Sequence, residues 1–138
     1  MIMAKTLIVE DSTFFRQLRK ETLLSQFPEM NISEAENAKE ALSKIVTFTP
    51  DLIFVDIRLP GESGLDFIRK IKSTHPNIPI IILTSYDLPE YREAAKDYQA
   101  DHFLSKGTTT RKNILALVTS ILSKPNHCPN GHNPGHPW

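Results

Sequence analysis

Five polar residues lie where short apolar runs of the sequence end: Glu10, Asp11, Asp56, Thr84 and Lys106. Carboxylates that are crowded together repel one another, so one of them keeps its proton unless a cation compensates the charge. An all-oxygen set of this kind suits a hard divalent ion, Mg²⁺ above all. Such an ion opposite a lysine ammonium can clamp a phosphoryl group, which a carboxylate can accept as an acyl phosphate. The pattern therefore predicts a site at which an aspartate is phosphorylated.

The apolar runs themselves indicate strands. The runs Thr6–Val9, Asp51–Val55 and Ile78–Leu83 are almost continuously apolar. This pattern is typical of strands that are buried on both faces of a parallel sheet. Two weaker strands are predicted at Asn31–Ala35 and His102–Leu104.

Apolar residues recur with helical spacing between these runs. The clearest stripe, over residues 114–122, has apolar residues at i, i+3, i+4, i+7 and i+8. Ser12 is placed to cap a first helix. Helices are therefore predicted at residues 13–26, 38–45 and 65–71, in the polar stretch after Pro89, and at residues 114–122.

Five alternating strand–helix units predict an α/β fold, which is a doubly wound, five-stranded parallel sheet with helices on both faces. A sheet of this kind binds its ligands at the carboxyl ends of its strands. Because the five polar residues fall at these ends, we expect the fold to bring them to one edge of the sheet.

The composition is that of an ordinary soluble domain. The 138 residues include 16 basic and 16 acidic residues, so no global charge attracts the chain to nucleic acid or to a membrane. The lone cysteine, Cys128, excludes an intrachain disulfide and suits a reducing compartment. We expect a cytoplasmic domain at residues 5–124, followed by a flexible tail at 125–138. The histidines of this tail match no zinc-binding spacing.

Over residues 5–124 the chain resembles the receiver domain of two-component response regulators, a family that includes the chemotaxis regulators. Four segments carry the resemblance, and each ends a predicted strand: Ile8–Ser12, Phe54–Gly64, Leu83–Ser85 and Leu104–Lys106. The resemblance implies the flavodoxin-like receiver topology. It also implies a protein that catalyses only its own phosphorylation and dephosphorylation, and is otherwise no enzyme.

The resemblance assigns a role to each residue at the acidic edge. Asp56 matches the phosphoacceptor, which takes its phosphoryl group from a histidine of a kinase or phosphotransfer protein. Asp11 matches the direct Mg²⁺ ligand, with Glu10 beside it acting through water. Asp56 and the backbone carbonyl of Arg58 match the other protein ligands of the ion.

Three further residues match the parts of the family that bind phosphate and respond to it. Thr84 matches the hydroxyl that bonds one phosphoryl oxygen, and Lys106 matches the ammonium that pairs with another. Phe103 stands at the position of the switch aromatic, whose rotamer is coupled to Thr84. Position alone does not separate this role for Phe103 from that of an ordinary core aromatic.

The resemblance also implies two interaction surfaces. The phosphoryl donor is expected to dock near the first helix, at Phe14, Phe15 and Leu18. The surface formed by the fourth helix, the fifth strand and the fifth helix is expected to contact an output protein or a second copy of the chain.

Two features depart from the common receiver pattern, and two bulky residues stand at positions that vary in the family. The acidic pair is Glu10–Asp11 instead of two aspartates, and Gly107 stands where many receivers have a proline. Arg58 and Tyr86 follow Asp56 and Thr84 by two residues, where bulky side chains can shield an acyl phosphate from water. We therefore expect slow hydrolysis of the phosphorylated form.

Two other functions fit the same fold. One is a protein-docking module that acts without phosphorylation; loss of an acidic residue, the threonine or the lysine would favour it, and all are present. The other is a flavodoxin-like electron carrier, which needs a hydroxyl-rich phosphate loop after the first strand. Glu10 and Asp11 occupy that place and would repel a flavin phosphate.

Overall fold

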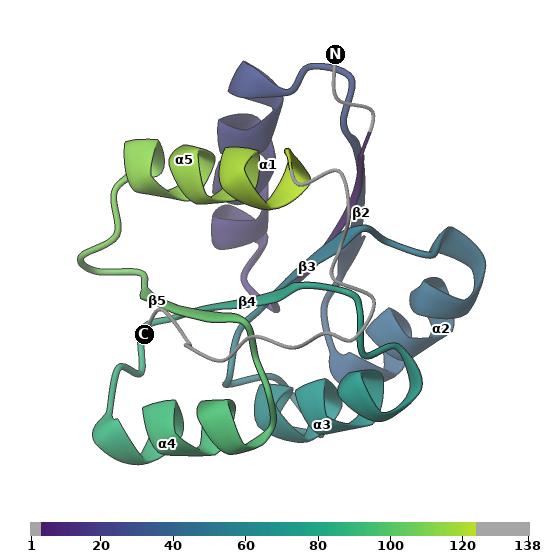
Figure 1. Cartoon of the computed structure of the whole chain (residues 1–138), viewed down its shortest axis with the longest axis vertical. Helices are drawn as coiled ribbons and strands as arrows, with labels where there is room; N and C mark the ends of the chain where they lie inside the picture. Colours follow the sequence, from purple (N-terminus) through teal and green to yellow (C-terminus); the bar gives the residue numbers. More distant parts are fainter. Residues whose placement is uncertain (1–3, 124–138) are drawn as a thin grey trace.

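A computed structural model describes residues 4–123 of the chain. In this part, five strands alternate with five helices (Figure 1). The strands are β1 (Lys5–Val9), β2 (Asn31–Ala35), β3 (Leu52–Val55), β4 (Ile80–Thr84) and β5 (His102–Ser105). The helices are α1 (Thr13–Gln26), α2 (Ala38–Phe48), α3 (Gly64–Thr74), α4 (Pro89–Asp97) and α5 (Arg111–Leu122). Lys124, at the end of the predicted domain, and the predicted tail at 125–138 lie outside the described residues.

The five strands form one parallel sheet in the order β2-β1-β3-β4-β5. The chain winds from β1 outward to β2, then returns to the other side of β1 and continues to β5. Figure 1 shows α1 and α5 together on one face of the sheet and α2, α3 and α4 on the other. The predicted doubly wound α/β fold is confirmed, and its topology switches between β1 and β3.

Burial explains why the central strands are apolar at consecutive positions. Every residue of β3 and β4 is buried, and in β1 only Lys5 is exposed. Helices cover both faces of these strands, so both sets of alternating side chains need apolar surroundings. The edge strands β2 and β5 are only partly buried, which matches their weaker apolar pattern.

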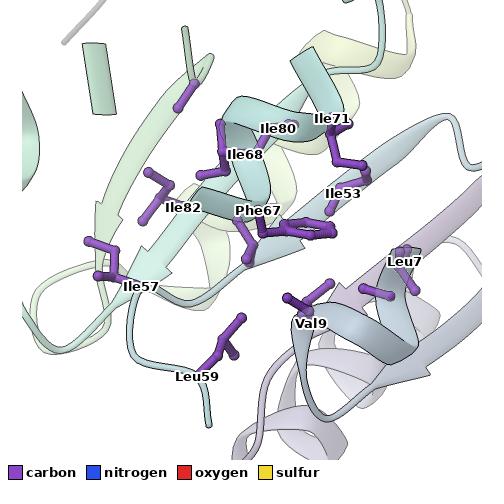
Figure 2. Close-up of a cluster of buried hydrophobic side chains, with 14 of the residues drawn as sticks. Leu7, Val9, Ile53, Ile57, Leu59, Phe67, Ile68, Ile71, Ile80 and Ile82 are labelled. Atoms are coloured by element: carbon purple, nitrogen blue, oxygen red, sulfur yellow. The ribbon is translucent and has the colours of Figure 1, made fainter. Parts of the chain in front are cut away.

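The alternation of side chains along the strands produces two separate cores. Figure 2 shows the larger one, in which Phe67 of α3 packs over strand residues such as Val9 and Ile53. The second core lies under α1 and α5 and includes Ile8 and Phe54. Along β1 and β3, residues of the two cores alternate. Glu10 and Asp56 come two positions after Ile8 and Phe54, so their side chains turn toward the same face, which α1 and α5 cover.

Most helices begin at a polar side chain that caps the first turn. The hydroxyl of Ser12 accepts a hydrogen bond from the Phe15 amide at 3.3 Å, as the sequence predicts. Asn37, Ser63 and Thr110 cap α2, α3 and α5 in the same way. Helix α4 has no side-chain cap and begins with a proline, whose missing N–H needs no partner at that position.

Two predicted strand starts are wrong by one or two residues. β3 begins at Leu52, because the Asp51 carboxylate turns to accept a hydrogen bond from the Lys5 amide at 2.9 Å. β4 begins at Ile80 instead of Ile78, because Pro79 has no N–H to donate to the ladder. At their other ends, β4 and β5 extend through Thr84 and Ser105. No helix in residues 4–123 is long and apolar enough to cross a membrane.

Candidate functional site

Lys106 joins two buried carboxylates at the carboxyl edge of the sheet. Its Nζ lies 2.5 Å from Glu10 Oε1 and 2.8 Å from Asp56 Oδ2. Glu10 and Asp56 are each only 6% exposed, and the lysine side chain is 8% exposed. The three residues follow β1, β3 and β5, so the sheet brings together groups that are 50 and 96 positions apart in the chain.

Backbone amides hold the second oxygen of each carboxylate. Glu10 Oε2 accepts a hydrogen bond from the Ser12 amide at 3.1 Å, and Asp56 Oδ1 accepts one from the Arg58 amide at 3.4 Å. The Asp56 amide donates to the Val9 carbonyl at 3.1 Å, which ties the residue to β1. Both carboxylates are therefore oriented by the turns that leave their strands.

The charges at this edge are only partly compensated. Burial raises the pKa of the Glu10 carboxyl above its ordinary value, and the neighbouring Asp56 carboxylate raises it further. Hydrogen bonds from Lys106 and from the Ser12 amide act in the opposite direction and lower it. One ammonium thus serves two carboxylates, and an added cation would relieve the remaining repulsion.

The position of Lys106 is set by its backbone and by an aromatic ring. Its amide donates to the Thr84 carbonyl at 2.8 Å, which continues the pairing of β4 with β5. Its Nζ lies 4.1 Å from the centroid of the Phe15 ring, within the range of a cation–π contact. The ammonium therefore contacts an aromatic face of α1 as well as the two acids.

Thr84 is the last residue of β4, and Phe103 lies in the neighbouring strand β5. Thr84 is fully buried, and its hydroxyl accepts a hydrogen bond from the Tyr86 amide at 3.2 Å. Phe103 belongs to the core under α3 and α4 and is buried. The guanidinium of Arg92, on α4, lies 4.6 Å from the centroid of the Phe103 ring. Both residues thus border the segment from β4 into α4.

Asp11 is not part of the buried carboxylate pair. The residue is exposed, and its backbone carbonyl accepts a hydrogen bond from Arg16 at 3.4 Å. Among residues 4–123, no three acidic, histidine or cysteine side chains are close enough to form a metal-holding group. The structure thus brings together two of the three carboxylates singled out in the sequence.

The donor set nevertheless fits a hard divalent cation. Glu10 and Asp56 lie close enough to share one ammonium, and both offer carboxylate oxygens. The exposed Asp11 carboxylate adjoins them in sequence, and the Arg58 carbonyl follows Asp56 by two residues. Oxygen ligands of this kind are those that Mg²⁺ takes, with water completing its shell.

Two side chains of α1 join the site although their sequence pattern did not assign them to it. Phe15 contacts Lys106, and Arg19, one turn later, borders a small cavity together with Glu10 and Asp56. The inward face of α1 continues with Thr22 and Leu23, which are buried. The sequence did contain a signal for this: Arg19 comes four positions after Phe15, on the side of the helix that also carries the apolar Leu23, so a burial of its charge could have been predicted.

Comparisons with known proteins agree with this geometry. A family model described as the response regulator receiver domain matches residues 6–119. A response regulator MprA from Mycolicibacterium vanbaalenii is 31% identical over 120 residues, which cover 87% of this chain and 51% of that protein. A protein-glutamate methylesterase/protein-glutamine glutaminase from Pseudoalteromonas atlantica is 35% identical over 123 residues, which cover 84% of this chain and 32% of that protein. The chain thus spans about a third to a half of these two curated relatives.

Solved structures give the same result. The crystal structure of a response regulator receiver domain protein (CheY-like) from Methanospirillum hungatei matches with a TM-score of 0.80 and 26% identity. That match covers 88% of this chain and 94% of the other. The likeness extends over nearly all of the described residues.

Proposed function

The chain belongs to the response regulator receiver domains of two-component systems, and from this we propose that it accepts a phosphoryl group on Asp56 and relays a signal through a change in its surface. The observation that carries the proposal is the contact of Lys106 with both Asp56 and Glu10 at the carboxyl edge of the sheet. A buried carboxylate beside a fixed ammonium is a suitable acceptor, because the ammonium stays in place to neutralise the incoming phosphoryl oxygens.

The proposed reaction is a phosphoryl transfer from a phosphohistidine. One Asp56 carboxylate oxygen attacks the phosphorus, an O–P bond forms, and the N–P bond to the donor imidazole breaks. The imidazole leaves with the bonding electron pair and takes up a proton from solvent. Lys106 then pairs with one phosphoryl oxygen, and the Thr84 hydroxyl bonds another.

Mg²⁺ is part of the proposal because the oxygen donors fit it. Glu10, Asp11, Asp56 and the Arg58 carbonyl would hold the ion, which would supply positive charge to the transferring phosphoryl group. The residues themselves orient Asp56 and hold its carboxylate beside Lys106. A phosphorylation that requires these groups is the only chemistry we propose for the chain, which is otherwise no enzyme.

The proposed output follows from the position of Thr84. Its hydroxyl now accepts from the Tyr86 amide and still has its own proton to donate, so a bond to a phosphoryl oxygen would move Thr84 together with the β4–α4 segment that is tied to it. Phe103 is buried beside this segment, and its ring would respond to the movement of Thr84. The surface of α4, β5 and α5 would then change toward an output protein or a second copy of the chain.

Receiver domains interact with histidine kinases, and we propose that the donor docks on α1. Phe14 is 70% exposed, and Leu18, one turn later, is 39% exposed. These two side chains form an apolar strip that begins three residues after Asp11. A donor histidine protein covering the strip would lie next to the Asp56 edge.

The test is phosphorylation by a small donor. The protein is incubated with acetyl phosphate and Mg²⁺, and its intact mass is measured beside an Asp56→Asn control and a chelated sample. We expect one added phosphoryl group in the protein with Mg²⁺ alone. If no adduct forms and a beryllium fluoride analogue also fails to bind, the chain is a docking module that acts without phosphorylation.

A further inference from the structure

Arg19 is a buried cation at the acidic edge that the proposed reaction does not use. It lies on the inward face of α1, one turn after Phe15, and is only 9% exposed. Among the described residues, its guanidinium has no hydrogen bond and no ion pair within 4 Å. A guanidinium offers five donors, and those of Arg19 have no protein acceptor although the residue is largely covered.

The neighbouring Arg16 shows the usual arrangement. Its Nη1 donates to the Glu10 carbonyl at 2.8 Å, and its Nε forms an ion pair with Glu34 at 3.3 Å. Arg16 therefore has acceptors for its donors, whereas Arg19 is placed without them. The difference indicates that Arg19 acts through its charge on its surroundings instead of through a fixed hydrogen bond.

Arg19 lies beside the two carboxylates of the site. Arg19, Glu10, Phe15 and Asp56 border one cavity of about 10 Å³, and its other walls are apolar. That volume holds at most about one water molecule, so little solvent lies between the side chains that line it. Burial lowers the pKa of the Arg19 guanidinium, and the field of the Glu10 carboxylate raises it. An arginine stays protonated throughout, so Arg19 is a permanent positive charge beside Glu10.

We infer that Arg19 is a resident counter-charge for Glu10 that weakens the binding of a divalent cation at the acidic edge of the sheet. The inference rests on the proposed function, because the cation is the Mg²⁺ of that site. Lys106 and Arg19 together bring two positive charges to two buried carboxylates, so less uncompensated negative charge is left to attract a dication. Arg19 stays beside these carboxylates because it lies on the buried face of α1.

The test is the affinity for Mg²⁺ itself. The full chain is titrated with MgCl₂ at constant ionic strength, and backbone amide NMR shifts of the β1–α1 turn report binding. Arg19→Met removes the charge and keeps the length of the side chain. We expect its Kd for Mg²⁺ to fall at least about threefold, since a nearby buried charge is weakly screened.

Three further variants separate charge from packing. Arg19→Lys keeps the charge and should restore a Kd within about twofold of the parent chain. Arg69→Met removes an exposed charge on α3, whose ion pair with Asp66 has side chains 61% and 48% exposed, and should leave the Kd unchanged. Arg19→Gln provides a second neutral side chain if the methionine variant does not fold, which thermal unfolding would reveal.

The outcomes are distinct for the inference and for the function on which it rests. An unchanged or weaker Mg²⁺ affinity in both neutral variants would overturn the role of Arg19 and leave the metal site intact. Failure of the parent chain and of every variant to bind Mg²⁺ would overturn the metal part of the proposed function, and the inference with it.

Discussion

Lys106 holds two carboxylates that the fold has removed from water. With Glu10 at 2.5 Å and Asp56 at 2.8 Å, its ammonium is the direct counter-charge of both. Buried ion pairs contribute little compared with apolar residues of the same size, but removing one partner leaves an uncompensated buried charge. The stability of the site is therefore most sensitive to the loss of the lysine.

We predict that Lys106→Met lowers the free energy of unfolding by about 3 kcal/mol at neutral pH in metal-free buffer. The added change Asp56→Asn should recover part of that loss, because one of the two repelling charges is then absent. Urea denaturation of the single and double variants measures both effects. Lys20→Met, which removes a half-exposed lysine 3.5 Å from Glu34, is the control and should cost no more than about 1 kcal/mol. Equal losses for Lys106→Met and the control would contradict the prediction.

Arg58 and Tyr86 form a stacked pair across the exposed side of the site. The guanidinium carbon lies 4.4 Å from the centroid of the tyrosine ring, and the residues come two positions after Asp56 and Thr84. If the pair shields an acyl phosphate on Asp56, Arg58→Ala and Tyr86→Ala should each speed its hydrolysis by about two- to fivefold, the rate equivalent of one cation–π contact.

The double variant tests whether the two side chains act as one unit. Its decay rate should be close to that of the faster single variant, since either change breaks the stack. The measurement is the loss of phosphorylated protein, followed by intact mass after the donor is removed. Multiplicative effects would show that the two side chains act independently.

At the scale of elements, the turn from β3 into α3 packs tightly against the phosphoacceptor. The Gly64 amide donates to the Ile57 carbonyl at 2.8 Å, and a Cβ on Gly64 would lie 2.0 Å from the Asp56 carbonyl oxygen. The atom in the way belongs to the backbone, so no side-chain rotation relieves the overlap. A glycine is needed here because the start of α3 approaches β3 so closely.

We predict that Gly64→Ala lowers the free energy of unfolding by at least about 2 kcal/mol, as overpacking does in a core. Gly107→Ala is the matched control, because its Cβ would have only the Ser105 hydroxyl within reach, at 3.9 Å. That change should leave stability within about 1 kcal/mol of the parent chain. Urea denaturation of both variants measures these free energies of unfolding. If Gly64→Ala is as stable as the control, the start of α3 can move away from β3 at little cost.

The loop from β4 to α4 is tied to its helix by an ion pair. Arg92 Nε lies 2.6 Å from Asp87 Oδ1, and the same guanidinium stacks on Phe103. Hydrogen bonds from Arg92 lower the pKa of the Asp87 carboxyl below its ordinary value. Arg92 therefore contacts both Asp87 of the loop and Phe103 of β5.

The pH dependence of this ion pair has a defined sign. Because the pKa of Asp87 is lower in the folded chain, the pair stabilises the fold above the ordinary aspartate pKa and loses this effect as the pH falls through the folded value. Asp87→Asn should therefore cost a small amount at pH 7, no more than about 1 kcal/mol for a pair so exposed. Unfolding free energies of parent and variant should converge between about pH 4 and pH 2. A difference that grows on acidification would contradict the assignment.

At the scale of the whole molecule, one sheet separates two apolar cores that share the central strands. The cores involve every helix of residues 4–123, and their members come from both ends of that range: Ala4 and Ile8 at one end, Ile114 and Ile121 at the other. Helices within residues 4–123 therefore cover both faces of the sheet.

We predict that removal of residues 125–138 leaves the free energy of unfolding within about 0.5 kcal/mol of the parent chain. The reason is that residues 4–123 already bury both faces of the sheet. Urea denaturation of the shortened and full chains tests this. A loss of more than about 1 kcal/mol would mean that the removed segment packs on the domain.

The sequence by itself determined which apolar runs form strands, the Ser12 cap of α1 and the polar residues at the strand ends. These signals are local. A continuous apolar run by itself indicates a strand that is buried on both faces, and the Ser12 hydroxyl needs only the Phe15 amide, three residues later, as its partner. The parallel sheet then required Glu10, Asp56 and Lys106 to share one edge. The predicted starts of β3 and β4 were less accurate because the Asp51 carboxylate accepts the Lys5 amide and Pro79 has no N–H to donate.

Only the tertiary structure decided which side chains meet at that edge. Asp11 stands next to Glu10 in sequence but is exposed, because it lies beyond the end of β1 in the turn that leads into α1. Phe15 and Arg19 reach the acids because the packing of α1 on the sheet sets the rotation of that helix. A helical stripe predicts a buried face but does not say which strand end it covers. The charge balance around Glu10 and Asp56 therefore depends on contacts between residues far apart in the chain, which no local pattern specifies.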